Sequence, residues 1–196
     1  MNGPVLDERT ALVVVDVQND FADPDGGLHV PDGDAVVAVV NELVRSARTA
    51  GAVVVYTQDW HPATTPHFAK DGGTWPVHCV AGTWGAELHP DLDVEGPVVR
   101  KGTGGEDGYS GFTVRDPESG AEEPTELAGL LEESGVERIV VVGLALDVCV
   151  QATALDGARL GFDTVVIRDA SRAVEVETGD GDRAVADMAA AGVTVI

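Results

Sequence analysis

The stretch Ile139-Val-Val-Val-Gly-Leu-Ala-Leu-Asp-Val-Cys149-Val-Gln-Ala-Thr-Ala154 decides the fold class of this chain. It consists of an apolar, β-branched run, a short turn and then a segment that is typical of a helix. A strand that leads directly into a helix is the repeating unit of α/β proteins. Because ligands of open α/β sheets bind beyond the carboxyl ends of parallel strands, this layout places the Cys149 thiol where a site is expected.

Apolar runs with the length of strands alternate with amphipathic segments along the whole chain. Such alternation predicts a parallel sheet with helices on both faces. We therefore expect an α/β protein with a three-layer doubly wound fold around a central, mainly parallel six-stranded sheet, in a single domain over residues 1–196. The expected strands are 11–16, 52–57, 97–100, 138–143, 163–167 and 192–196, and the expected helices are 34–50, 125–134, 148–160 and 181–191.

Residue types near the helix ends agree with these boundaries. Asp34 is expected to cap the first helix, and Gly51 lies just past its end. Pro124 lies near the start of the second helix and Gly135 lies just after its end, where proline and glycine, respectively, are preferred. The spans 58–96 and 102–123 fit neither a helix nor a strand. Long insertions of this kind are where a site is usually built.

Three residues with complementary chemistry lie at the carboxyl ends of predicted strands. Asp16 ends the first strand, Lys101 follows the third, and Cys149 lies beyond the fourth. A carboxylate base, a cation that favours a thiolate and a thiol nucleophile are the groups that a cysteine hydrolase needs. Taken singly, Asp16 could cap a turn, Lys101 could be solvated, and Cys149 could be a small buried hydrophobe. Their common position favours the catalytic interpretation.

The insertion at about 58–96 carries a second group of residues. Asp59, His61, His67 and His78 fall within one short stretch. An Asp-X-His pair followed by a more distant histidine suits one divalent ion, with zinc preferred and iron or manganese as alternatives. Histidines that bond only to the backbone of their loop are the competing interpretation. The remaining histidines, His29 and His89, lack such spacing and are expected at the surface.

Several other motifs are expected to have no catalytic role. The loop Gly102–Gly108 is rich in glycine, but it completes no dinucleotide-binding pattern. The acidic clusters 23–25, 32–34 and 180–182 lack the spacing of a calcium loop and are expected in turns and helix caps. Cys79 is expected to be a packing residue, and a resolving thiol for Cys149 is the weaker alternative.

The net charge of −22 argues against polyanionic partners, so neither nucleic acid nor an anionic membrane is expected to bind. No apolar run is long enough to span a membrane, and the N-terminal residues 1–9 lack the pattern of a secretory signal. Two cysteines do not make a disulfide framework. These features favour a reducing cytoplasm.

The ordered set of motifs resembles the isochorismatase-like cysteine hydrolases, and within them the nicotinamidase (pyrazinamidase) branch. The resemblance covers essentially the whole chain. The matching segments are Val15-Asp16-Val-Gln-Asn-Asp-Phe21, Thr57-Gln-Asp59-Trp-His61-Pro62, Trp75-Pro-Val-His78-Cys-Val-Ala-Gly-Thr-Trp-Gly-Ala-Glu87, Lys101-Gly102, Tyr109-Ser-Gly-Phe112, Gly143-Leu-Ala145-Leu-Asp147-Val-Cys149-Val-Gln-Ala-Thr-Ala154 and Asp169-Ala-Ser-Arg172.

The resemblance implies hydrolysis of nicotinamide, and of pyrazinamide, through a thioester on Cys149. Asp16 would act as the base, and Lys101 would hold the pair in its charged form and lower the pKa of the thiol. The backbone N–H groups of Ala145 and Cys149 would form the oxyanion hole, next to a cis peptide bond between Leu144 and Ala145.

The resemblance also implies a metal and a substrate pocket. Asp59, His61 and His78 match metal ligands, and His67 matches a fourth ligand that only some members have. The metal would bind the pyridine nitrogen and supply or orient water. The residues that match the walls around the ring are Phe21, Trp75 and Tyr109.

Two positions depart from the pattern of the family. Leu146 replaces a common threonine and Val148 replaces an aromatic residue or histidine, and both are expected to flank the pocket. A hydrolase of the same fold that acts on another small amide or carbamoyl compound is therefore the nearest alternative. A non-catalytic binding or redox protein is disfavoured by the complete set of Asp16, Lys101 and Cys149. A homo-oligomer is possible.

Overall fold

The computed structural model describes residues 6–196 and contains a six-stranded sheet in the order β3-β2-β1-β6-β7-β8. Every neighbouring pair in this sheet is parallel, which confirms the predicted doubly wound α/β fold. The strands are β1 (Thr10–Val15), β2 (Val53–Asp59), β3 (Val98–Lys101), β6 (Arg138–Leu144), β7 (Asp163–Arg172) and β8 (Thr194–Val195). The four longest α-helices are α2 (Ala35–Thr49), α3 (Leu127–Glu133), α4 (Gln151–Arg159) and α5 (Asp180–Ala190).

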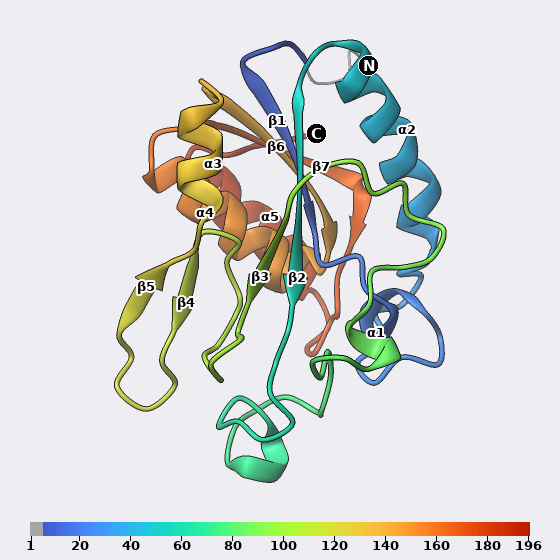
Figure 1. The fold of residues 1–196 in the computed structure, drawn as a ribbon, viewed down its shortest axis with the longest axis vertical. Coiled ribbons are helices and arrows are strands. Elements are labelled where there is room, and N and C mark those ends of the chain that lie inside the picture. The colour runs from blue at the N-terminus through green and yellow to red at the C-terminus, as the bar shows by residue number, and fades with distance from the viewer. Residues whose placement is uncertain (1–5) are drawn as a thin grey trace.

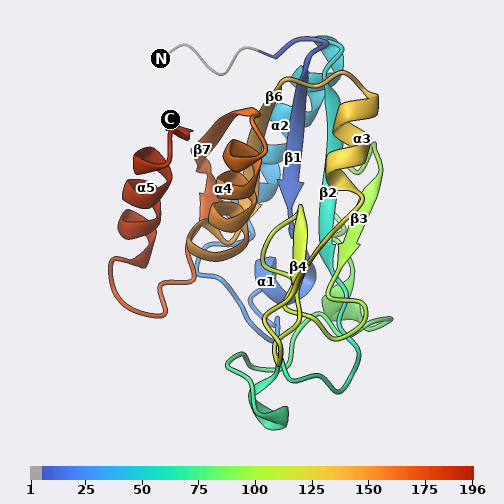
Figure 2. The same ribbon diagram turned by 90° about the vertical axis from the view of Figure 1, so that its left-hand side faces the viewer.

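The helices cover the sheet from both sides (Figures 1 and 2). Helix α2 packs on one face, and α3, α4 and α5 lie on the other. All of β1 is buried, and its side chains alternate between the two cores. Leu12 and Val14 join the core beneath α2, whereas Ala11, Val13 and Val15 join the core beneath α4. A strand buried on both faces is expected to be apolar throughout, as this one is.

The chain reverses the direction of strand addition between β1 and β6. From β1 it runs outward through β2 to β3, and from β6 it runs through β7 to β8 on the other side. Ligands of such sheets bind in the crevice at this switch point, outside the carboxyl ends of the strands. These ends point downward in Figure 1, toward the insertion that follows β2.

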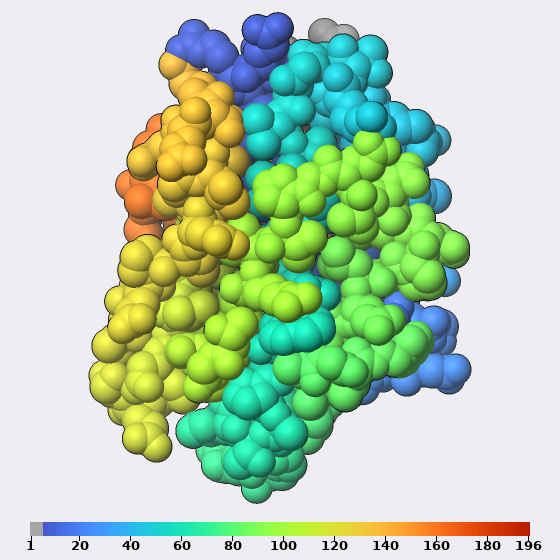
Figure 3. Space-filling view, viewed as in Figure 1, coloured from blue at the N-terminus to red at the C-terminus, as the bar shows by residue number. Residues whose placement is uncertain are grey.

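The insertions contain short elements that the sequence pattern does not predict. They are the 3-10 turns Ala69–Asp71 and Trp84–Ala86 and an antiparallel hairpin of β4 (Thr113–Arg115) and β5 (Glu122–Pro124). Another unpredicted element, the short helix α1 (Asn19–Ala22), follows β1. In the space-filling view, the green and yellow segments between β2 and α3 form much of the lower part of one face (Figure 3). The insertions therefore add a wall beside the strand ends.

Several predicted boundaries need correction. Asp34 occupies the N-cap position of α2, but its side chain makes no capping hydrogen bond. Pro124 ends β5 instead of beginning α3, because the hairpin uses this residue before the helix starts at Leu127. Gly51 and Gly135 have the positive φ angles expected after a helix. Ahead of α4, the turn Leu146–Val150 is a π-helix.

The surface predictions for the two remaining histidines have different outcomes. His29 is exposed as expected, whereas His89 is half-buried, and its Nδ1 accepts a hydrogen bond from the Asp91 N–H at 3.2 Å. Cys79 is fully buried, as a packing residue should be.

No helix within residues 6–196 combines the length and apolar character needed to cross a membrane. The expectation of no secretory signal rests on residues 1–9, of which residues 1–5 lie outside the described part of the chain.

Candidate functional site

Lys101 is the centre of a buried group of charges at the strand ends. Its Nζ lies 2.7 Å from Asp16 Oδ2, 2.5 Å from Asp59 Oδ1 and 3.8 Å from Cys149 Sγ. It also donates a hydrogen bond to the Gly108 carbonyl. The structure thus brings together the three residues that the sequence places after separate strands, and it adds Asp59 to them. Lys101 and the carboxylates are at most 4% exposed.

Asp16 is held in place by its backbone and by Thr57. It follows β1 directly with a φ angle of 48°, and its N–H donates to the Thr57 carbonyl at 3.3 Å. The Thr57 hydroxyl donates to Asp16 Oδ1 at 2.6 Å. Burial raises the pKa of Asp16 to about 6, although Lys101 beside it acts in the opposite direction. A carboxyl group with this pKa can accept and return a proton near neutral pH.

Cys149 lies in the π-helical turn that precedes α4 and is 6% exposed. Burial raises the pKa of its thiol well above the usual range and outweighs the attraction of Lys101. Lys101 acts to lower this pKa, as predicted, but the loss of solvent and the facing carboxylates Asp16 and Asp59 outweigh it. A buried thiol of this kind needs a nearby base to take its proton as it reacts.

The backbone before Cys149 needs a glycine. Gly143 has a φ angle of 112°, and a Cβ at this position would lie 2.1 Å from the Val15 carbonyl oxygen. Only glycine tolerates this approach of β6 to β1. The peptide bond between Leu144 and Ala145 is cis, as the resemblance implied.

The three histidines of the insertion converge beside Asp59. Ring nitrogens of His61, His67 and His78 lie within 4.8 Å of one another, and all three side chains are buried. Asp59 Oδ2 lies 3.6 Å from His61 Nε2 and 3.8 Å from His78 Nε2. The structure therefore gathers all four predicted ligands, including His67, at one point.

Hydrogen bonds orient two of these imidazoles. His67 Nδ1 lies 2.7 Å from Asp107 Oδ1, and His78 Nδ1 lies 2.8 Å from the Pro76 carbonyl oxygen. In both rings the Nδ1 atom is therefore occupied, which leaves Nε2 without a proton as an electron-pair donor. Neither nitrogen of His61 has a hydrogen-bond partner within the described residues, although the ring is fully buried. A buried imidazole without hydrogen-bond partners is expected where one of its nitrogens coordinates a metal ion.

The protonation of the cluster also fits a metal. Burial lowers the pKa of His78 to about 4 and lowers that of His67. Both rings are thus neutral at pH 7, the form that coordinates metals. Burial opposes ionisation of Asp59, but Lys101 and His61 together lower its pKa. One carboxylate and three imidazoles suit zinc, iron or manganese.

Gln18 positions the backbone of Asp59 and was not predicted as part of the site. Its Oε1 accepts from the Asp59 N–H, and its Nε2 donates to the Asp59 carbonyl, both at 2.8 Å. The same amide donates to the Ala86 carbonyl at 2.9 Å. Gln18 therefore joins the end of β2 to the loop that closes the insertion. The only signal in the sequence was its place in the first matching motif.

Residues of both clusters line one cavity. The predicted wall residues Phe21, Trp75 and Tyr109 line it, and Trp75 Nε1 donates to the Tyr109 hydroxyl at 3.0 Å. Val148 also lines the cavity. Leu146, which was expected to flank the pocket, is instead buried in the core beneath α4. The complete lining is Phe21, Leu28, Asp59, His67, Trp75, His78, Gly108, Tyr109, Ala145, Val148, Cys149 and Val174.

Two apolar residues of this lining, Leu28 and Val174, were not predicted from the sequence. Each lies in an irregular loop just outside a matching motif, Leu28 after Phe21 and Val174 after Arg172. Asp147 holds the second loop, because its carboxylate oxygens accept from the N–H groups of Val174 at 2.8 Å and Glu175 at 2.9 Å. No pattern in the sequence indicates such a contact, which only the folded chain creates.

Comparisons with known proteins agree with this geometry. Residues 10–196 match the profile described as "Isochorismatase domain". The nicotinamidase of Escherichia coli (strain K12) is 37% identical over 203 residues, which cover 94% of this chain and 93% of the relative.

Two solved structures are also similar along nearly their whole length. The pyrazinamidase of Pyrococcus horikoshii in complex with zinc has a TM-score of 0.84 at 39% identity and covers 96% of this chain and 98% of its own. PnC1 from L. infantum in complex with nicotinate has a TM-score of 0.88 at 36% identity, with 98% and 95% covered.

Proposed function

Because the chain belongs to the isochorismatase domain family, and within it to the nicotinamidase and pyrazinamidase branch, we propose that this amidohydrolase converts nicotinamide to nicotinate and ammonia and also accepts pyrazinamide. One observation carries the proposal. A buried thiol with a carboxylate and an ammonium, and a cluster of three histidines beside Asp59, both border one cavity with aromatic walls.

The first half of the reaction forms a thioester. Asp16 takes the proton of Cys149 as the sulfur attacks the amide carbon, which explains how a thiol with a raised pKa can react. The N–H groups of Ala145 and Cys149 donate to the oxyanion that forms. Asp16 then passes its proton to the amide nitrogen, the C–N bond breaks and ammonia leaves. Lys101 balances the charge of Asp16 throughout.

The second half returns the enzyme to its starting state. Water attacks the thioester carbon, and Asp16 accepts a proton from that water. The C–S bond breaks, the acid is released and the proton returns to the sulfur of Cys149. A divalent ion bound by Asp59, His61, His67 and His78 would supply Lewis acidity for the ring nitrogen and for water, with zinc preferred and iron or manganese as alternatives. Phe21, Trp75 and Tyr109 enclose the ring.

Two further features are included in the proposal. Both cysteines are free, which supports the reducing cytoplasm as the compartment. Residues 1–196 would act as a single hydrolase domain on a small-molecule substrate, with the insertion after β2 supplying the metal ligands.

The decisive experiment measures ammonia release from a matched panel of amides. Nicotinamide and pyrazinamide should be hydrolysed, whereas benzamide, which has the same shape without a ring nitrogen, should be a poor substrate. Metal analysis of the same preparation should find about one divalent ion per chain. Equal rates on nicotinamide and benzamide by a metal-free protein would contradict the assignment and leave a cysteine hydrolase of another amide or carbamoyl compound.

A further inference from the structure

Asp107 is a buried carboxylate that none of the matching motifs contains. It lies in the loop between β3 and β4, and it is 9% exposed. Its Oδ1 lies 2.7 Å from His67 Nδ1. A residue outside the metal-site insertion thus contacts the fourth of the potential ligands.

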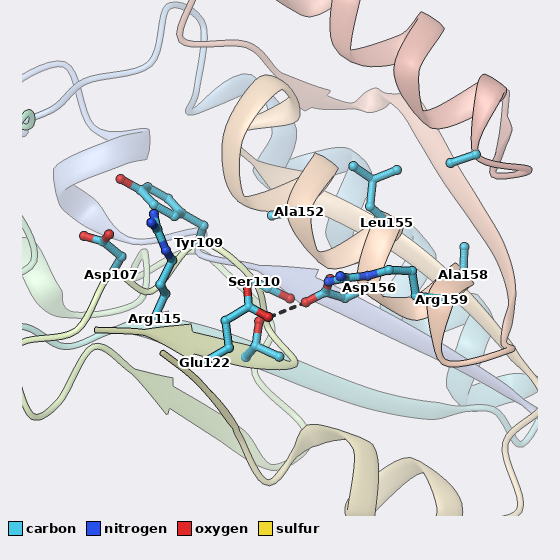
Figure 4. A pocket seen from close by; sticks show the side chains of 12 residues that line it. Asp107, Tyr109, Ser110, Arg115, Glu122, Ala152, Leu155, Asp156, Ala158 and Arg159 are labelled. Carbon is cyan, nitrogen blue, oxygen red and sulfur yellow. Dashed lines mark hydrogen bonds and ion pairs between the residues drawn. The ribbon is translucent and has the colours of Figure 1, made fainter. Parts of the chain in front are cut away.

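The backbone of Asp107 is fixed independently of His67. Its N–H donates to the Arg115 carbonyl at 2.8 Å, and its carbonyl accepts from the Arg115 N–H at 3.0 Å, which ties it to β4. Figure 4 shows Asp107, Tyr109 and Arg115 at one end of a hollow whose other wall is α4. The carboxylate is therefore presented to His67 from the hairpin side, as a preformed partner.

His67 has few other constraints on its position. Its N–H donates to the Thr65 hydroxyl oxygen at 3.1 Å, and that hydroxyl donates to the Gly105 carbonyl at 2.6 Å. These bonds place the backbone of His67 beside the loop 102–108, but they do not select its tautomer. A carboxylate beside Nδ1 selects the tautomer, because it accepts a hydrogen bond from the Nδ1–H group and leaves Nε2 with a free electron pair.

We propose that Asp107 is a positioning residue that makes His67 a metal ligand, by fixing the tautomer and orientation of its ring. The inference rests on the metal site of the proposed function and adds the residue that decides whether the fourth ligand is engaged. It further implies that the hairpin β4–β5, which holds Asp107, contributes to metal affinity although it supplies no ligand.

The test measures the affinity of metal-depleted protein for Zn²⁺ and Co²⁺ by competition with a chromophoric chelator. Asp107→Ala should weaken binding about 10–100-fold, the usual effect of losing such a partner. Asp107→Asn keeps an acceptor oxygen without the charge and should lose less. Glu122→Ala is the matched control, because it removes an acid from the same hollow that does not contact His67, and it should bind as the wild type does.

A double-mutant comparison separates positioning from a general effect of charge or folding. In a His67→Ala background, Asp107→Ala or Asp107→Asn should cause no further loss of affinity, because the residue acts through the missing ring. The visible absorption of bound Co²⁺ should change in the same direction for His67→Ala and Asp107→Ala. Thermal unfolding of the metal-depleted variants checks that each is folded.

The outcomes distinguish this inference from the proposed function. Unchanged affinity in Asp107→Ala, or an equal loss in the His67→Ala background, would overturn the role of Asp107. If His67→Ala binds both metals normally while His61→Ala does not, the metal site stands and the role of Asp107 falls. A wild-type protein that binds neither metal would overturn both proposals together.

Discussion

The proposed catalytic residues Asp16, Lys101 and Cys149 follow strands of the sheet, whereas the three histidines lie in an insertion that adds no strand to it. The first group is positioned by the register of β1, β3 and β6, which the two hydrophobic cores hold. The second is positioned by individual hydrogen bonds, such as those of His67 and His78. The proposed chemistry thus rests on strand ends of the sheet, and the proposed metal ligands rest mainly on an insertion beside it.

The two groups also differ in charge. The strand-end group buries an ammonium among carboxylates, so each charge depends on its neighbours. In the second group, burial lowers the pKa of His67 and of His78, which favours their neutral forms. Asp59 belongs to both groups, with one oxygen on Lys101 and the other toward the histidines. The comparison predicts that damage to the first group affects both stability and chemistry, whereas damage to the second affects metal binding and turnover but not the fold.

Removal of the nucleophile should have the largest effect. Cys149→Ala should lower kcat by roughly 10⁴-fold or more, because no thioester can form. The fold should persist, since the side chain is small. Ammonia release measures the rate, and Cys79→Ala is the control that should retain activity because Cys79 is buried away from the cavity. Substantial turnover by Cys149→Ala would refute the thioester route.

Removal of the central cation should damage both stability and activity. Lys101→Met leaves Asp16 and Asp59 as buried, uncompensated carboxylates, which should cost about 3–5 kcal/mol of unfolding free energy. Urea denaturation measures the loss, and ammonia release should fall with it. The exposed lysine supplies the control, because Lys70→Met should unfold like the wild type. Equal stability of the two variants would show that the strand-end charges are not interdependent.

Loss of a single imidazole should affect turnover without affecting the fold. His61→Ala should lose metal and reduce the rate on nicotinamide by about 10²–10³-fold, the scale of a lost Lewis acid. Its unfolding free energy, measured without metal, should stay close to that of the wild type. Alkylation of Cys149 by a thiol reagent should also continue. A strongly destabilised His61→Ala would remove the contrast between the two groups.

The smallest predicted effect is a fall in kcat/KM on the acidic side of the pH profile, called here the acidic limb. Asp16 must be ionised to act as the base, and its pKa is raised from 3.8 to about 6. The value of kcat/KM should therefore fall as the pH drops through about 6, roughly tenfold per unit below it. His78 should not produce this limb, because its pKa is about 4. A pH profile of ammonia release with its limb near 4 would assign control to another group.

The sequence by itself determined the sheet and the three strand-end residues of the site. The strands are predictable because buried parallel strands are continuously apolar, and Asp16, Lys101 and Cys149 could be placed together because such strands end at one edge. The hairpin β4–β5 could not be predicted. Its strands are three residues each and largely polar, so they are defined only by pairing with one another.

Tertiary structure decided the environment of these residues. The sequence shows a lysine and a helix start near Cys149 and so predicts a lowered pKa, but burial raises it. It likewise shows neither that Asp107 meets His67 nor that Asp147 holds the loop of Val174 over the cavity. Desolvation and contacts between distant segments depend on where the whole chain packs, whereas strand periodicity and strand ends are local properties that the sequence carries directly.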